Sequence, residues 1–162
     1  MREGRDLSGS SIVRLLGVRA GALLACRSVG ASVDVQRLVL WDPVPDGASH
    51  LRELRRMQEA VNERGLSLSR AERRETLHDY AGYRLSERMV NEFRLLDASA
   101  YSSVPKNKLH VVNTSSVAGF PVHGVPQYVA RFACNWETDL DDLMLMMPKP
   151  VLERLCACLT MS

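Results

Sequence analysis

The sequence has few of the features that mark metal, membrane or nucleic-acid proteins. Its four cysteines match no zinc-binding spacing, because the one close pair is Cys156 and Cys158. The longest apolar stretch, residues 20–26, is far too short to cross a bilayer. A net charge of +2 creates no field strong enough to attract nucleic acid. We therefore expect no metal site, no cofactor, no membrane span and no nucleic-acid partner.

We also expect no secretory leader, because residues 1–10 are polar and charged and no apolar core follows them. The cysteines are interpreted as small apolar side chains in a reducing compartment, so the expected location is the cytoplasm. What the sequence does contain is ordinary for a globular protein, with 46% apolar and 25% charged residues. Its 162 residues suffice for one domain, spanning residues 1–162.

The first part of the chain predicts a strand, a helix and a second strand. Residues 11–16 and 37–41 are rich in β-branched and aliphatic side chains, and residues 20–28 between them are good helix formers. Such a unit places its two strands side by side and parallel, joined by a right-handed crossover.

A helical, lid-like insert is predicted from about residue 47 to residue 97. Ser49 is expected to cap its first helix, whose apolar side chains recur at helical spacing. Two more helices are expected at 70–80 and 86–96.

The strand pattern returns at residues 109–113 and 128–134, and a closing helix is expected at 151–159. The predicted fold class is therefore α/β, with a mainly parallel sheet of about four strands.

One motif lies at the junction of the first strand and helix. Gly17-x-Arg19-x-Gly21 has the spacing and the setting of the nucleophile elbow, Gly-x-Ser-x-Gly. The turn is so sharp that its flanking residues must be small, and it lifts the central residue above the carboxyl edge of the sheet. A purely structural turn is the alternative interpretation of this short match.

The segment around this motif resembles a known family. Residues 10–45 resemble the elbow, helix and strand of α/β-hydrolases of the serine-aminopeptidase-like branch. In hydrolase-like proteins associated with the exosortase A system, a Gly-x-Arg-x-Gly-Ala run resembles residues 17–22, and a strand ending Leu-Trp-x-Pro resembles residues 40–43. Residues 82–86 and 135–138 look similar as well. The resemblance implies a partial α/β-hydrolase fold, the C-terminal portion alone, and a family of ester or acyl hydrolases.

Two departures from that family matter. Several strands and the oxyanion loop precede the elbow in the superfamily, and this sequence has no room for them. We interpret it as a truncated chain, or as a shortened scaffold whose sheet is completed by a second copy or a partner chain. The second departure is the catalytic triad itself.

The triad lacks two of its three members. Arg19 cannot be the nucleophile, because a guanidinium stays protonated in proteins. Asp42 ends the strand beside the elbow strand and is the candidate acid, although Asp-Pro is equally a common strand terminator. No histidine lies between residues 134 and 140, where the base is expected, so His123 is the remaining candidate and an exposed loop position is its alternative. We therefore predict a non-catalytic or degenerate hydrolase homologue, a pseudoenzyme.

Two roles for Arg19 follow. It is predicted to form a buried ion pair with Asp42, which would fill the former catalytic centre. Alternatively, it binds a small anionic or acyl ligand through a carboxylate or phosphate group, in a pocket beneath the insert. That pocket would take its apolar walls from Trp41, Leu54, Met57 and Phe93.

Overall fold

The computed structural model describes residues 12–31, 35–64, 79–114, 124–130 and 148–161. Its elements, in chain order, are β1 (Arg14–Val18), α2 (Gly21–Ala31), β2 (Arg37–Trp41), α3 (Gly47–Arg64), α5 (Glu87–Arg94), α6 (Ser99–Ser102), a short 3₁₀ helix (Lys106–Lys108), β3 (Leu109–Thr114), β4 (Gln127–Ala130) and α8 (Lys149–Thr160).

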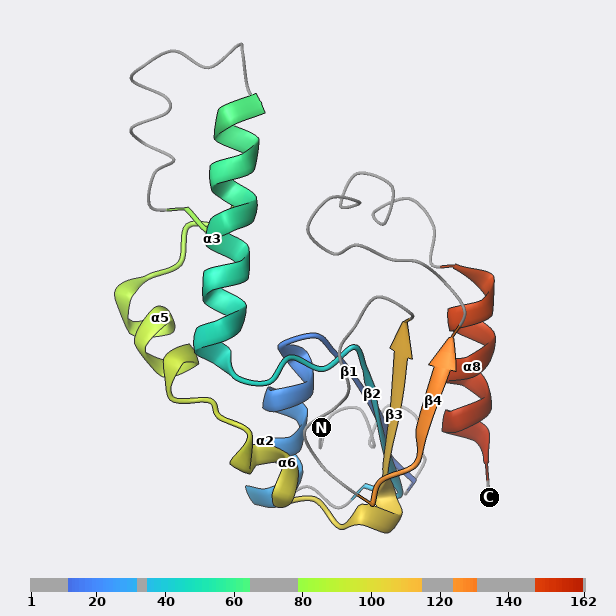
Figure 1. Cartoon of the computed structure of the whole chain (residues 1–162). Coiled ribbons are helices and arrows are strands. Elements are labelled where there is room, and N and C mark those ends of the chain that lie inside the picture. The colour runs from blue at the N-terminus through green and yellow to red at the C-terminus, as the bar shows by residue number, and fades with distance from the viewer. Residues whose placement is uncertain (1–11, 32–34, 65–78, 115–123, 131–147, 162) are drawn as a thin grey trace.

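The four strands form one parallel sheet in the order β1-β2-β3-β4 (Figure 1). Gly17 of β1 lies beside Leu40 of β2, which in turn lies beside Val111 of β3. The α/β fold class and the parallel sheet of about four strands are thus confirmed. All four carboxyl ends meet at one edge of the sheet, which is where the side chains that follow the strands gather.

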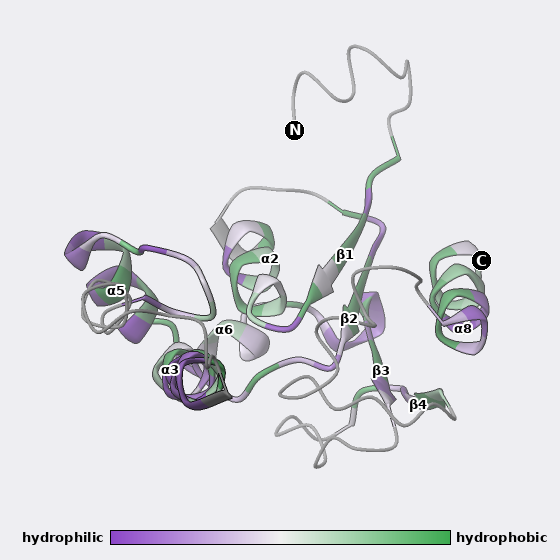
Figure 2. Cartoon of the chain, turned by 90° about the horizontal axis from the view of Figure 1, so that it is seen from above, coloured by the Kyte–Doolittle hydropathy of each residue, from purple (hydrophilic) through white to green (hydrophobic). Residues whose placement is uncertain are grey.

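Helices cover both faces of the sheet, as parallel sheets require. Alternate residues of β2 point to opposite faces, so Leu38 and Leu40 pack beneath α2 while Val39 and Trp41 pack beneath α8. Figure 2 shows α8 on one side of the sheet and α2, with the insert, on the other. A hydrogen bond of 2.8 Å from Arg37 Nη1 to the Cys158 carbonyl ties the end of α8 to β2.

The cysteines that the structure describes are reduced, and two of them belong to the core. Cys26 of α2 and Cys158 of α8 are buried in the core clusters on the two faces of the sheet, whereas Cys156 of α8 is exposed. Burial raises the pKa of the Cys26 thiol to about 12, so it behaves as a small apolar side chain.

The insert leaves the sheet after β2 and returns before β3. Its two ends meet where the N–H of Gly47 donates a 2.8 Å hydrogen bond to the carbonyl of Leu96. A side chain at Gly47 would place its Cβ 1.9 Å from the Phe93 carbonyl oxygen, so glycine alone fits this crossing. Within the insert α3 packs against α5, whose first turn is capped by Ser86.

One predicted strand boundary differs from the structure, and two predicted elements lie partly outside the described residues. The first strand occupies 14–18 instead of 11–16. Residues 70–78 of the predicted second insert helix lie outside the described residues, and Tyr80 at its end pairs with Tyr83 in an isolated bridge. Residues 131–134 of the last predicted strand also lie outside the described part. Within the described ranges, none of the helices has both the length and the apolar character needed to cross a membrane.

Candidate functional site

The turn after β1 has the geometry of an elbow. Arg19 adopts a φ of 50°, which non-glycine residues rarely do, and its N–H donates to the Trp41 carbonyl at 3.0 Å. Helix α2 starts at once, because the carbonyl of Arg19 accepts the N–H of Ala22 at 3.0 Å. The residue at the centre of the motif is therefore held rigidly at the carboxyl edge of the sheet, directly before a helix.

The two glycines of the motif differ in importance. A Cβ on Gly17 would lie 2.7 Å from the Cα of Ala22, a backbone atom that cannot move aside. A Cβ on Gly21 would meet nothing within 4 Å. The close approach of strand and helix therefore requires glycine at position 17, whereas position 21 can accept a side chain.

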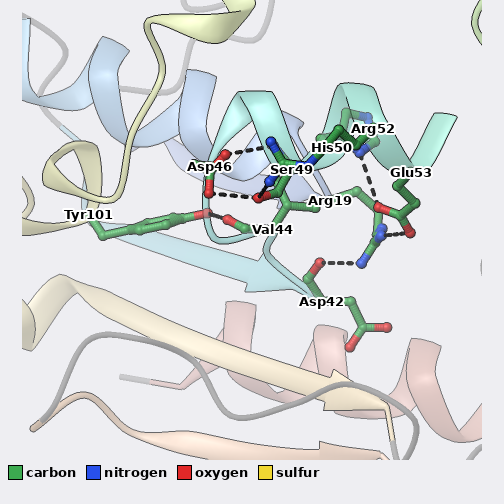
Figure 3. A network of polar contacts seen from close by, with 9 residues as sticks. All are labelled: Arg19, Asp42, Val44, Asp46, Ser49, His50, Arg52, Glu53 and Tyr101. Atoms are coloured by element: carbon green, nitrogen blue, oxygen red, sulfur yellow. Dashed lines mark hydrogen bonds and ion pairs between the residues drawn. The ribbon is translucent and has the colours of Figure 1, made fainter. Parts of the chain in front are cut away.

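The guanidinium of Arg19 is engaged by the insert. Its Nη2 forms an ion pair with the Glu53 carboxylate on α3, and its Nη1 lies 3.4 Å from the Asp42 carbonyl oxygen (Figure 3). The side chains of Arg19 and Glu53 are each 16% exposed, so much of the pair is shielded from water. On the same face of α3, His50 Nδ1 lies 3.5 Å from Glu53 Oε2, and its ring packs 6.3 Å from that of Phe93.

The pair is charged at neutral pH. Burial by itself would raise the pKa of Glu53, but the contact with His50 and the positive charge of Arg19 outweigh burial, so this pKa falls below its ordinary value. A guanidinium is protonated at any physiological pH. The two groups therefore attract each other as full charges, and an incoming anion would have to displace Glu53 to reach Arg19.

Asp42 lies at the end of β2 in a similar turn. Its φ is 43°, and its N–H donates to the Val112 carbonyl at 2.9 Å. Its fully buried carboxylate accepts two hydrogen bonds of 2.6 Å from Thr114, one from the N–H and one from the hydroxyl. The carboxylate therefore fastens the end of β2 to the end of β3.

The prediction of an Arg19–Asp42 ion pair named the wrong carboxylate. The turn at Asp42 directs its carboxylate away from Arg19 (Figure 3), toward β3, and presents its backbone carbonyl to the guanidinium instead. Glu53 reaches Arg19 from α3, which passes above the same edge of the sheet.

The apolar walls predicted for a pocket at Arg19 lie in separate parts of the molecule. Trp41 packs under α8 in the cluster of Val39 and Val151. Leu54 belongs to the small cluster inside the insert, and Phe93 lies between that cluster and the one beneath α2. Trp41 is thus a core residue on the α8 face of the sheet, whereas α2 and the insert cover the other face.

His123, the candidate base, lies outside the described residues. The described residues contain no group of three or more histidine, cysteine or acidic side chains that could hold a metal ion. Sequence reasoning missed Glu53, His50 and Thr114. The available signal was the three-residue spacing of His50 and Glu53, which places both on one face of α3.

Comparison of the chain with protein-family models and with curated protein sequences gives no match.

Proposed function

We propose that the chain is a non-catalytic homologue of the α/β-hydrolases, in which the residue at the nucleophile elbow fastens a helical insert to the sheet. The observation that carries the proposal is the ion pair between Arg19, at the elbow, and Glu53, on α3. A position that would hold an attacking hydroxyl holds a protonated, paired guanidinium, which has no nucleophilic lone pair to offer.

The surroundings of the elbow support the relationship to hydrolases. The strand, the strained turn and the helix follow one another without a spacer, and a helical insert separates β2 from β3 in a parallel sheet. Close packing at Gly17 is what an elbow demands, because the chain reverses within a few residues.

The hydrogen bonds and the burial of Asp42, the candidate acid, favour a structural role for its carboxylate. An orienting acid in a triad must accept a hydrogen bond from a histidine. Both carboxylate oxygens of Asp42 already accept hydrogen bonds from Thr114, and the residue is fully buried. Its charge stabilises the ends of two strands instead of orienting a base.

An anion-binding role for Arg19 is less favoured than this structural role. The guanidinium has a carboxylate partner within the molecule, and a free anion would compete with a side chain that is tethered beside it at high effective concentration.

The proposal is tested by treating the folded chain with a fluorophosphonate probe and measuring its intact mass, with hydrolysis of a nitrophenyl ester followed in parallel. We expect neither an adduct nor turnover above the buffer rate. A serine hydrolase treated alongside shows that the probe is active, and circular dichroism shows that the chain is folded. A stoichiometric adduct together with turnover would reveal an activated serine and overturn the proposal.

A further inference from the structure

A cavity of about 380 Å³ opens between α3 and α5, and it is lined by the side chains of Arg55, Tyr80, Leu85, Glu87, Val90, Asn91 and Arg94. We propose that this cavity binds a small organic anion, a carboxylate or phosphate monoester carried on an aromatic ring. The proposal does not depend on the relationship to hydrolases.

The charges of the cavity favour an anion. Arg55 comes from α3 and Arg94 from α5, and among the described residues neither guanidinium forms an ion pair with a carboxylate. Glu87 is the one acidic side chain in the lining, so the cavity carries an excess of positive charge. Guanidinium groups recognise carboxylates and phosphates through paired hydrogen bonds, and the amide of Asn91 supplies a further donor.

The aromatic part of the ligand is inferred from the remaining walls. The lining includes half-buried Leu85 beside buried Val90 and Tyr80, and Arg55 lies over the ring of Tyr80, 5.3 Å from its centre. An arginine held against an aromatic ring presents its N–H edge to an anion while its flat face stays covered. A ring attached to the anionic group would then rest on the apolar wall.

The wall that Tyr80 contributes to the cavity is held in place by the protein's own hydrogen bonds. Tyr80 is 4% exposed, and paired backbone hydrogen bonds with Tyr83, of 2.8 and 3.0 Å, close the turn that carries it. The buried side chain of Gln58 on α3 accepts the N–H of Gly82 at 2.6 Å and anchors the turn to the helix. Gly82 has a φ of 82°, a conformation that suits glycine. A preformed wall lowers the ordering cost of binding.

The size of the cavity also fits a ligand of this class. Clefts that bind small molecules generally range from about 300 to 1,000 Å³. This cavity lies near the lower end of that range, so it has room for one ring with its anionic group.

The experiment is a titration of the full chain with benzoate and with phenyl phosphate, followed by amide chemical shifts in NMR spectra. We expect saturable shifts at Tyr80, Val90 and Asn91, with dissociation constants of about 0.1–1 mM. Phenol, which has the ring without the charge, should bind at least about tenfold more weakly, because it cannot form charge-assisted hydrogen bonds with the arginines.

Variants separate this site from general attraction to a basic surface. The double variant Arg55→Gln/Arg94→Gln should weaken binding of both anions at least about tenfold, because it removes both guanidinium groups. Arg88→Gln is the matched control, since Arg88 is on the same helix but pairs with Glu92 and does not line the cavity, so binding should be unchanged.

Three results would overturn the proposal. These are unaltered binding in the double variant, equal affinity for phenol, and absence of saturable shifts at the cavity residues at millimolar anion. Circular dichroism of each variant confirms that lost binding does not arise from lost structure. Benzoate and phenyl phosphate carry the same ring, so the ratio of their affinities identifies the preferred anionic group, carboxylate or phosphate.

Discussion

The chain turns twice at the same edge of the sheet, after β1 and after β2, and the two turns share a backbone geometry but not a set of partners. Arg19 and Asp42 both adopt positive φ, and each donates its N–H to the neighbouring strand. The Asp42 carboxylate is bound by Thr114, within the sheet, whereas the Arg19 guanidinium is bound by Glu53, in the insert. The first contact stabilises the sheet itself, and the second joins the sheet to a separate group of helices.

The largest loss of stability is expected from substitution of Asp42, the turn residue whose partners lie within the sheet. Asp42→Ala removes two hydrogen bonds to a buried charge and leaves alanine at a positive φ, so the free energy of unfolding should fall by about 3 kcal/mol. Urea denaturation measures this change. Asp42→Asn is the control, because asparagine tolerates the turn and can still bond to Thr114, so its loss should be about 1 kcal/mol. Equal losses in the two variants would contradict the role given to the carboxylate.

The next largest loss of stability is expected at Gly17, and it should distinguish this glycine from Gly21 in the same turn. Gly17→Ala forces a Cβ against the backbone of Ala22 and should cost about 2 kcal/mol. Gly21→Ala meets open space at the start of α2 and should be neutral or stabilising by about 0.5 kcal/mol. Thermal unfolding of both variants checks the contrast. If both were tolerated equally, strand and helix would not approach as closely as the structure shows.

The ion pair between Arg19 of the sheet and Glu53 of the insert should contribute less stability than the contacts of Asp42 and Gly17, because it is partly exposed. A double-mutant cycle with Arg19→Met and Glu53→Gln should give a coupling free energy of about 1 kcal/mol. Hydrogen exchange of the α3 amides should quicken in either single variant, while that of β2 and β3 should not change. A coupling free energy of zero, with unchanged exchange in α3, would show that the pair does not fasten the insert.

The smallest effect is on the pH dependence of stability. The folded state lowers the pKa of Glu53, so the contribution of its charge is complete above the ordinary glutamate pKa of about 4.3 and is lost as the pH falls through the lower, folded value. The difference in unfolding free energy between wild type and Glu53→Gln should therefore be constant near neutrality and shrink in acid. The other carboxylates are common to both proteins and cancel. A difference that stayed constant into strong acid would contradict the ion pair.

Much of the fold could be predicted because it depends on local patterns. The strand–helix–strand unit and its parallel pairing follow from β-prone runs around a helix-forming stretch. The capped helix α5, at residues 87–94, was also predictable, since Ser86 precedes side chains at helical spacing.

The partners at the sheet edge could not be predicted, because they depend on residues far apart in the chain. Glu53 is one of several glutamates on a charged helix, and the sequence does not reveal which of them faces Arg19. Asp42 was placed at the correct edge, but its positive φ turns the carboxylate toward Thr114, 72 residues later. Ala81, one residue beyond the helix predicted at 70–80, likewise adopts a left-handed φ of 49°, which propensity alone does not indicate for alanine.

The hydrogen bond between Gly47 and Leu96 has a consequence for the evolution of the chain. It brings the start and the end of a fifty-residue excursion to one point, so the sheet and its two facing helices do not depend on the length of what lies between. A segment whose ends already meet can be shortened, enlarged or exchanged for another without a change in the order of the strands. The insert is therefore the part of this protein that can acquire a new specificity most readily, while the sheet remains as it is.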